Sequence, residues 1–233
     1  STHTYYDIVY IYISDAEHIG RGEAAPSVRY DESTNQIITH LKSIDNIDNN
    51  LNLEEGAFWC KKNSNGISSL EAALSTAWLD LWTKKNNRRI STYFNSGKNM
   101  LYTSFTIAIG DLDLIPKKIE EAKSYNILKI KLGINEQHDK NIIKLIRKET
   151  DKIIRVDANE GWDLDTGKKM CKWLADHNVE FVEQPFKAQN LGDTAKLREV
   201  SPLPLIADEN SIKSSNIPDI VHAFDGINIK LMK

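Results

Sequence analysis

Five ionisable residues near the ends of short apolar segments have the types and the spacing for acid–base chemistry. They are Lys131, Asp157, Glu183, Asp208 and Lys230, and successive members lie 22 to 26 residues apart. Each step has the length expected of one strand followed by one helix. Because the carboxyl ends of parallel strands meet at one end of a sheet or barrel, we expect the five side chains to gather there.

The three acidic members of this set predict a metal site. Carboxylates that converge on one point repel one another unless a positive charge neutralises them. All the candidate ligand atoms are oxygens, which favours a hard divalent cation, and Mg²⁺ keeps positions open for water or substrate. The sequence therefore predicts that Asp157, Glu183 and Asp208 bind Mg²⁺.

The two lysines of the set are candidate bases. A crowded, partly dehydrated site beside a bound cation favours the uncharged amine, which is the form that accepts a proton. Lys129 stands two residues before Lys131, so in a strand both side chains lie on the same face. The charge of Lys129 would further disfavour protonation of Lys131.

Alternating strands and helices in the second half of the chain must position these residues. Helical patterns cover residues 136–149 and 164–177 and fill the other gaps between short apolar segments. This alternation is typical of a parallel sheet, and no glycine-rich dinucleotide fingerprint follows any strand, which favours a barrel. The six predicted strands are 105–110, 127–133, 153–159, 181–185, 205–209 and 227–230.

The first hundred residues follow a different pattern. A strand over 5–13 precedes a turn rich in glycine, and helices are expected near 33–43 and over 68–85, the second capped by a serine before Glu71. The sequence thus predicts a small α+β domain over 1–99 and a βα-repeat domain over 100–233.

Composition excludes several classes of function. The 233 residues carry 30 basic and 33 acidic side chains, a net charge of −3, which does not suggest a partner in nucleic acid or at a membrane surface. No apolar run approaches the roughly 18 residues of a membrane span. Cys60 and Cys171 lie far apart and form no disulfide framework, so a cytoplasmic protein is expected.

Five motifs, in this order, resemble those of the enolase superfamily. Within it the chain is similar to the muconate-lactonizing subgroup, above all to dipeptide epimerases, including those that act on L-Ala-D/L-Glu. The resemblance implies a TIM-like (β/α) barrel that here stops after six strands, with an N-terminal α+β capping domain. The motifs are "KIKLG" at 129–133, "VDANEGW" at 156–162, "VEQP" at 182–185, "ADEN" at 207–210 and "INIKLMK" at 227–233.

The resemblance also implies a reaction and gives the aligned residues their roles. It implies Mg²⁺-dependent epimerisation of a dipeptide by 1,1-proton transfer through an enolate, with Lys131 and Lys230 as acid/bases on opposite faces and Lys129 tuning Lys131. The three carboxylates match the Mg²⁺ ligands. Asn159 and Glu209 match positions just behind the metal, and Lys233 matches a supporting residue of the last motif. Thr106 lies on the first predicted barrel strand, which makes it a candidate for contact with the substrate.

The chain departs from the usual family pattern in two motifs and in length. Glu160 stands where Gln is usual, and Asn210 stands where Ser is usual. Eight strands close a barrel of this type, so six strands lead us to expect a fragment. Two alternatives stay open: a cycloisomerase or an o-succinylbenzoate synthase-like enzyme with the same site, and a truncated, non-catalytic subunit. The dipeptide's identity and the oligomeric state, including a homo-oligomer, also stay open.

Overall fold

The chain divides into two compact units. In this computed structural model residues 5–94, 101–110 and 112–231 are described, so Lys233 lies outside the described residues. One unit comprises Ser1–Asn99 with Lys230–Lys233, and the other comprises Met100–Ile229. Each unit has its own hydrophobic core.

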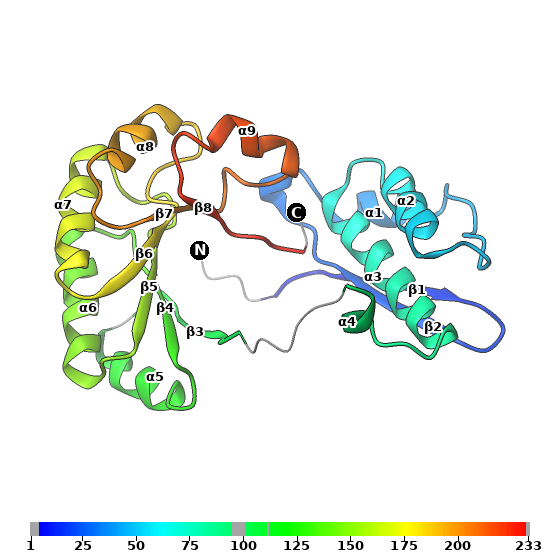
Figure 1. The fold of residues 1–233 in the computed structure, drawn as a ribbon, viewed down its shortest axis with the longest axis horizontal. Coiled ribbons are helices and arrows are strands. Elements are labelled where there is room, and N and C mark those ends of the chain that lie inside the picture. The colour runs from blue at the N-terminus through cyan, green and yellow to red at the C-terminus, as the bar shows by residue number, and fades with distance from the viewer. Residues whose placement is uncertain (1–4, 95–100, 111, 232–233) are drawn as a thin grey trace. The chain divides into compact units, whose positions relative to one another are not determined.

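The second unit is built on a parallel sheet with the strand order β3-β4-β5-β6-β7-β8. The sheet is not closed into a barrel within the described ranges (Figure 1). The predicted α/β class is confirmed, although the strands end earlier than their apolar runs suggested. Their bounds are β3 (Ser104–Ile107), β4 (Ile127–Lys131), β5 (Ile153–Asp157), β6 (Val179–Glu183), β7 (Leu205–Ala207) and β8 (Gly226–Ile227).

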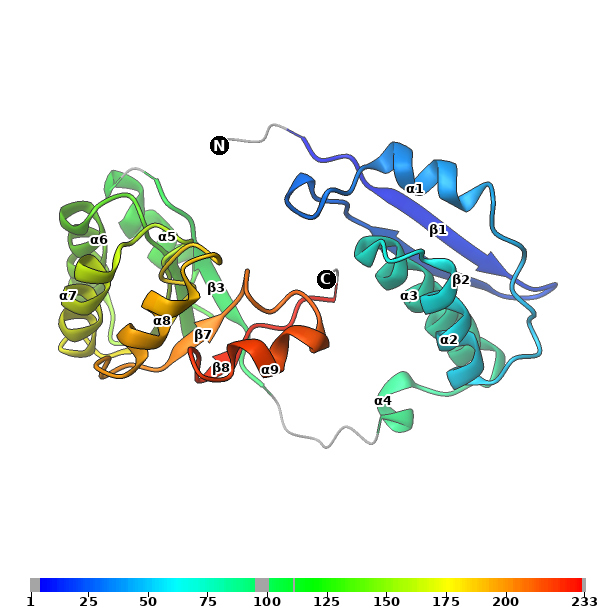
Figure 2. The same cartoon turned by 90° about the horizontal axis from the view of Figure 1, so that it is seen from above.

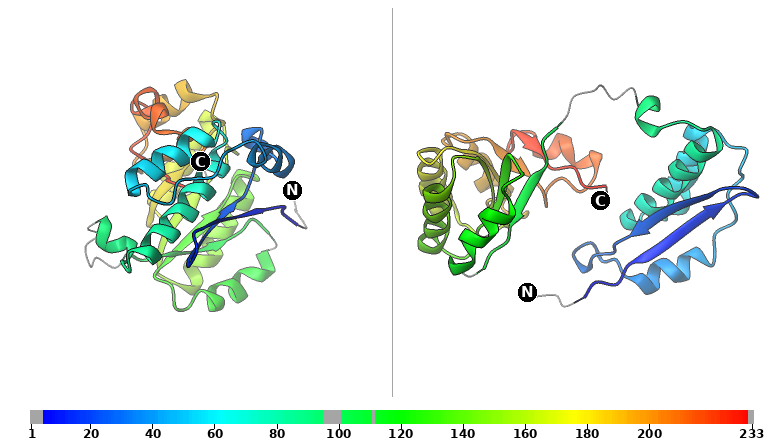
Figure 3. Two further views of the ribbon diagram at one scale, coloured as in Figure 1. Left: turned by 90° about the vertical axis from the view of Figure 1, so that its right-hand side faces the viewer. Right: turned by 90° about the horizontal axis from the view of Figure 1, so that it is seen from below.

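Alternation along the strands gives this sheet one apolar face, which helices cover. Leu128 and Ile130 of β4 and Ile154 and Val156 of β5 are all fully buried on that face. The covering helices lie outside the sheet (Figure 3). They are α5 (Ile115–Glu121), α6 (Glu136–Glu149), α7 (Leu164–Ala175), α8 (Leu191–Arg198) and α9 (Ile217–Ile220).

Side-chain caps fix where two of these helices begin. The Asn135 side chain accepts a hydrogen bond from the backbone N–H of His138 at the start of α6, and the Asp163 side chain does the same for Thr166 of α7. The predicted range 136–149 agrees with α6, and α7 ends two residues before the predicted 177. None of the helices in the described part of the chain could span a membrane.

The first unit packs helices against a two-stranded antiparallel sheet. β1 (Val9–Ser14) pairs with β2 (Ile19–Ala24), and Ile11 and Ile13 are buried against the helices while Tyr10 and Tyr12 are exposed. The long helix α3 lies along β2 (Figure 2). The helices are α1 (Thr34–Leu41), α2 (Leu53–Asn63), α3 (Ser68–Lys85) and α4 (Ile90–Tyr93), of which the sequence predicted only α1 and α3.

The start of α3 differs from the prediction of a serine cap. The N-cap residue is Ile67, which has no capping side chain. Glu32 supplies the cap instead: its Oε1 atom accepts hydrogen bonds from the backbone N–H groups of Ser68 at 2.7 Å and Ser69 at 3.3 Å. A carboxylate from a distant loop therefore satisfies the free N–H groups of the helix and complements its dipole.

The contact between β2 and α3 gives a test of the first unit. An added Cβ at Gly22 would lie 1.9 Å from the carbonyl oxygen of Ala73, a backbone atom that cannot turn away. We expect Gly22→Ala to lower the free energy of unfolding by about 2–3 kcal/mol. Urea titration measures this, with Gly192→Ala as control: a Cβ there meets nothing within 4 Å. The close contact is contradicted if both variants unfold alike.

Candidate active site

The ends of three neighbouring strands bring a lysine and two carboxylates into one row. Lys131 of β4 is the register partner of Asp157 of β5, and Asp157 is the partner of Glu183 of β6. Glu183 in turn pairs with Ile206 of β7, and Asp208 follows Ile206 by two residues. The two-residue step returns to the same face, so all three predicted metal ligands come from one side of adjacent strands.

These three carboxylates are buried, and ammonium groups hold two of them, Asp157 and Glu183. Asp157, Glu183 and Asp208 are 2%, 3% and 3% exposed. The Nζ atom of Lys129 lies 2.6 Å from Oε2 of Glu183 and 3.2 Å from Oδ2 of Asp157. The Nζ atom of Lys131 lies 3.3 Å from the same Asp157 oxygen. We call the group formed by Lys129, Lys131, Asp157 and Glu183 the ion cluster.

Lys129 stays a cation in this cluster. Its burial alone would lower its pKa, but the charge of Asp157 and the hydrogen bond and charge of Glu183 outweigh burial, so the pKa is raised above its ordinary value. Lys129 therefore supplies part of the positive charge that the sequence analysis assigned to a metal.

Two asparagines complete the polar contacts of the cluster. The Oδ1 atom of Asn159 accepts from Lys131 Nζ at 3.4 Å, and the Asn159 backbone N–H donates to Asp157 Oδ1 at 3.1 Å. Asn228 Nδ2 donates to Glu183 Oε1 at 2.8 Å. The sequence analysis did not single out Asn228, although its place in the "INIK" motif, just before Lys230, is a signal that could have found it.

The donor set has the chemistry of a magnesium site, but its geometry here is that of an ion cluster. Among the residues that the structure describes, no three His, Cys, Asp or Glu side chains are arranged so that they could hold a metal ion. The Lys129 ammonium instead contacts both Asp157 and Glu183. Three buried carboxylates from adjacent strands, two of them in contact with lysine side chains, nevertheless match the oxygen ligands that Mg²⁺ prefers.

The other predicted site residues come from three places in the chain. Thr106 is exposed on β3, where it is the register partner of Lys129. Glu209 follows Asp208 and is half-buried. Lys230 stands three residues after the end of β8 and is grouped with the first unit. Its role as the second base stays a prediction.

A buried aspartate fixes the loops that follow β4 and β5. Asp139, in the first turn of α6, is fully buried, and its carboxylate accepts hydrogen bonds from the Gly133 backbone N–H at 3.0 Å and from Trp162 Nε1 at 2.9 Å. Gly133 has a φ of 109°, and a Cβ at Gly161 would lie 2.5 Å from its Cα. The two loops therefore touch backbone to backbone, directly beyond Lys131 and Asp157.

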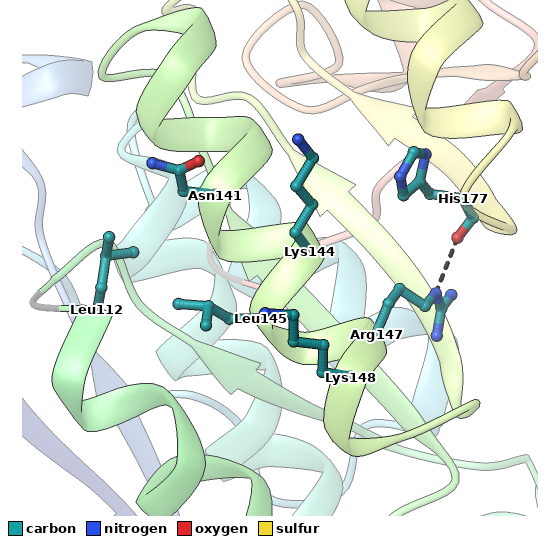
Figure 4. A pocket seen from close by; sticks show the side chains of 7 residues that line it. All are labelled: Leu112, Asn141, Lys144, Leu145, Arg147, Lys148 and His177. Atoms are coloured by element: carbon teal, nitrogen blue, oxygen red, sulfur yellow. Dashed lines mark hydrogen bonds between the residues drawn. The ribbon is translucent and has the colours of Figure 1, made fainter.

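An open hollow on the outer side of α6 is separate from this cluster. It is lined by residues including Asn141, Lys144 and Lys148 and contains none of the predicted site residues (Figure 4). Arg147 at its rim is held in place, because its Nε atom donates to the carbonyl oxygen of His177 at 2.8 Å. Among the described residues that line the hollow there is no carboxylate for metal binding.

A comparison with protein families matches residues 116–233 to the family described as enolase C-terminal domain-like. The chain belongs to this enolase-like family. The predicted resemblance to the enolase superfamily is thereby confirmed. The matched range contains the strands from β4 onward and every member of the ion cluster.

Named proteins of similar sequence match this chain over most of its length. An L-Ala-D/L-amino acid epimerase of Pedosphaera parvula (strain Ellin514) is 34% identical over 92% of this chain and 63% of its own length. An L-Ala-D/L-Glu epimerase of Bacteroides thetaiotaomicron is 34% identical over 92% of this chain and 57% of its own length. The chain thus spans about three fifths of the length of these relatives.

The fold agrees with that of solved enolase-like structures. A dipeptide epimerase from Enterococcus faecalis V583, complexed with Mg and the dipeptide L-Leu-L-Tyr, superimposes with a TM-score of 0.86 at 26% identity. The superposition covers 98% of this chain and 68% of that one.

Substitution of Asp139 tests whether its hydrogen bonds hold the loops that follow β4 and β5. Asp139→Ala removes the acceptor of three N–H donors, those of Gly133, Ile134 and the Trp162 ring, which we expect to lower the free energy of unfolding by about 3 kcal/mol. Urea unfolding followed by tryptophan fluorescence measures this. Asp165→Ala, an exposed aspartate in the first turn of α7, should cost about 0.5 kcal/mol and serves as the control. Equal losses in the two variants would mean that the buried contacts do not hold the loops.

Proposed function

We propose that the chain carries the site of a Mg²⁺-dependent dipeptide epimerase, which inverts the carbon next to a carboxylate by 1,1-proton transfer. The observation that carries this proposal is the ion cluster, in which two lysines of β4 face buried carboxylates of β5 and β6. Residues 1–99 would form the capping domain and residues 100–233 the domain that holds the site.

The named relatives support the choice of substrate. The similar proteins of Pedosphaera and Bacteroides are named L-Ala-D/L-amino acid epimerase and L-Ala-D/L-Glu epimerase, and the Enterococcus structure holds Mg and a dipeptide. A small molecule with a free carboxylate is also the ligand that a cationic, metal-binding site would attract.

Asp157, Glu183 and Asp208 would hold the metal, since all three are buried, come from adjacent strands and offer only oxygen ligands. When bound, Mg²⁺ would stabilise the negative charge that develops on the substrate carboxylate as the α-proton leaves. Lys129 would have to give up its contact with Glu183 to free that oxygen. It would remain a cation beside the site and add to the same stabilisation.

Lys131 would move the proton on one face of the substrate. Its Nζ atom is held by Asp157 at 3.3 Å and by Asn159 at 3.4 Å, so the amine is directed toward the carboxylates rather than free to turn into solvent. Lys230 would move the proton on the opposite face. Two bases on opposite faces explain inversion, because one removes the proton from one side while the other delivers a proton to the other side.

The buried thiols support a cytoplasmic location. Cys60 and Cys171 are both free, and burial raises their pKa values to about 12 and about 11. Neither cysteine therefore offers a reactive thiolate, and neither forms a disulfide that would need an oxidising compartment.

Separate lysine substitutions test the two-base assignment. In D₂O with Mg²⁺, the unsubstituted chain should exchange the α-proton of both stereoisomers of a dipeptide such as L-Ala-L-Glu. Lys131→Ala and Lys230→Ala should each lose epimerisation by about 10²-fold or more but keep exchange with opposite single isomers. Mass spectrometry of a dipeptide library reads the exchange.

Lys172→Ala, an exposed lysine on α7, is the matched control and should exchange both isomers. If Lys131→Ala and Lys230→Ala behave like this control, the lysine assignment is wrong. No exchange by the unsubstituted chain would favour a cycloisomerase-like or non-catalytic role.

Addition of Mg²⁺ tests the carboxylate assignment without any substrate. A ligand that binds only the folded state at 100 times its Kd stabilises that state by about 2.7 kcal/mol, which should raise the melting temperature. Asp208→Asn should abolish the rise. Asp219→Asn, an exposed aspartate on α9, should keep it. A rise that survives Asp208→Asn would place the metal elsewhere.

A further inference from the structure

Gln184 lies where the loops that follow β5, β6 and β7 meet. It comes directly after Glu183, is fully buried and has a φ of 41° in the left-handed region. Its backbone N–H donates to the carbonyl oxygen of Ile206, and its own carbonyl oxygen accepts from the backbone N–H of Glu160. One residue therefore bonds to backbone atoms close to each of the three proposed metal ligands.

The side chain of Gln184 uses its full hydrogen-bonding capacity within these loops. Its Oε1 atom accepts from the backbone N–H of Asp208 at 3.0 Å and from that of Asn210 at 3.4 Å. Its Nε2 atom donates to the carbonyl oxygen of Phe186 at 2.9 Å and to Oδ1 of Asn210 at 2.6 Å. A glutamine amide offers two donors and one acceptor atom with two lone pairs, so every site is occupied.

The two positions at which the motifs depart from the usual pattern bind the same residue. Asn210 Nδ2 donates to the carbonyl oxygen of Ala188 at 3.0 Å, and Glu160 Oε1 accepts from the backbone N–H of Ala188 at 2.8 Å. Glu160 and Asn210 are 50 positions apart in the chain. Their side chains thus hold both polar backbone atoms of one loop residue.

We propose that Gln184, with Glu160 and Asn210, forms a positioning network that sets the relative places of Asp157, Glu183 and Asp208 for metal binding. The inference rests on the proposed function, because it concerns the same carboxylates. None of the three residues needs to touch the substrate or the reacting atoms, so they are positioning residues and not catalytic ones.

Backbone strain beside the ligands explains why such a network is needed. Asn159, Glu160 and Gln184 have φ values of 49°, 62° and 41°, and all three follow closely after Asp157 or Glu183. Residues other than glycine rarely adopt this conformation, so surrounding contacts must enforce it. The hydrogen bonds of the network act on these residues or on their neighbours, so its loss should let the loops relax and the carboxylates shift.

Metal affinity tests the network in a way that a general loss of stability does not imitate. Mn²⁺ serves as the probe, and electron paramagnetic resonance measures its Kd for the full chain. Gln184→Met keeps the size of the side chain but removes its hydrogen bonds, and we expect Mn²⁺ to bind 10- to 100-fold more weakly. Leu174→Ala is the matched control, because it opens a cavity under α7 without touching the three loops. It should lower the melting temperature and leave the Kd within about 2-fold.

Two substitutions of Glu160, one conservative and one not, give a second test by the Kd for Mn²⁺. Glu160→Gln keeps an oxygen that can accept from Ala188, so its Kd should stay near that of the unsubstituted chain, whereas Glu160→Ala should weaken Mn²⁺ binding. If Gln184→Met and Glu160→Ala bind Mn²⁺ as tightly as Leu174→Ala does, the inference is overturned and the proposed function stands.

Hydrogen exchange separates the inference from the proposed function when the metal itself does not bind. In the metal-free chain, Gln184→Met should speed amide exchange at least 10-fold in peptides that cover 184–190 and 205–211, and Leu174→Ala should not. If the unsubstituted chain binds no Mn²⁺, the metal-dependent function fails, whatever the exchange shows. Unchanged exchange in Gln184→Met would overturn the network on its own.

Discussion

The second unit depends on charge compensation inside a parallel sheet. Three carboxylates that are almost fully buried would be strongly destabilising alone, because removing a charge from water costs several kcal/mol even after relaxation. Lys129 and Lys131 lie within 3.3 Å of Asp157, and Lys129 also contacts Glu183. The parallel strands make this arrangement feasible, since they place residues far apart in the chain side by side at one end of the sheet.

The two faces of the sheet have different roles: one packs against helices, and the other carries the charged residues of the site. One face is apolar and is covered by helices, so it holds the strands in register, while the lysine face is free to carry charge. The loops beyond the strand ends are held by buried polar residues rather than by apolar packing. Asp139 fixes the loops after β4 and β5, and Gln184 joins those after β5, β6 and β7. The site is therefore supported from both sides of the ion cluster.

The sequence predicted the features that follow from repeating patterns along the chain. It missed the contacts that depend on how neighbouring strands are aligned with each other. Helix α6, the βα repeat and the placement of Lys131, Asp157 and Glu183 at strand ends all follow from repeating patterns in the sequence. The Lys129 bridge between neighbouring strands and the Asn228 contact with Glu183 need the register between strands, which no local pattern contains. The cap of α3 was missed for a similar reason, because Glu32 reaches it from a separate loop.

The contact between Gly133 and Gly161 has a consequence for how this kind of site can diversify. A Cβ at either glycine would meet backbone atoms of the other loop, at 2.3 Å for Gly133 and 2.5 Å for Gly161. No choice of rotamer relieves a clash that begins at Cβ, so neither position tolerates a side chain while the loops keep their course. Changes in ligand preference that keep the course of these loops must therefore enter through other loop positions than Gly133 and Gly161.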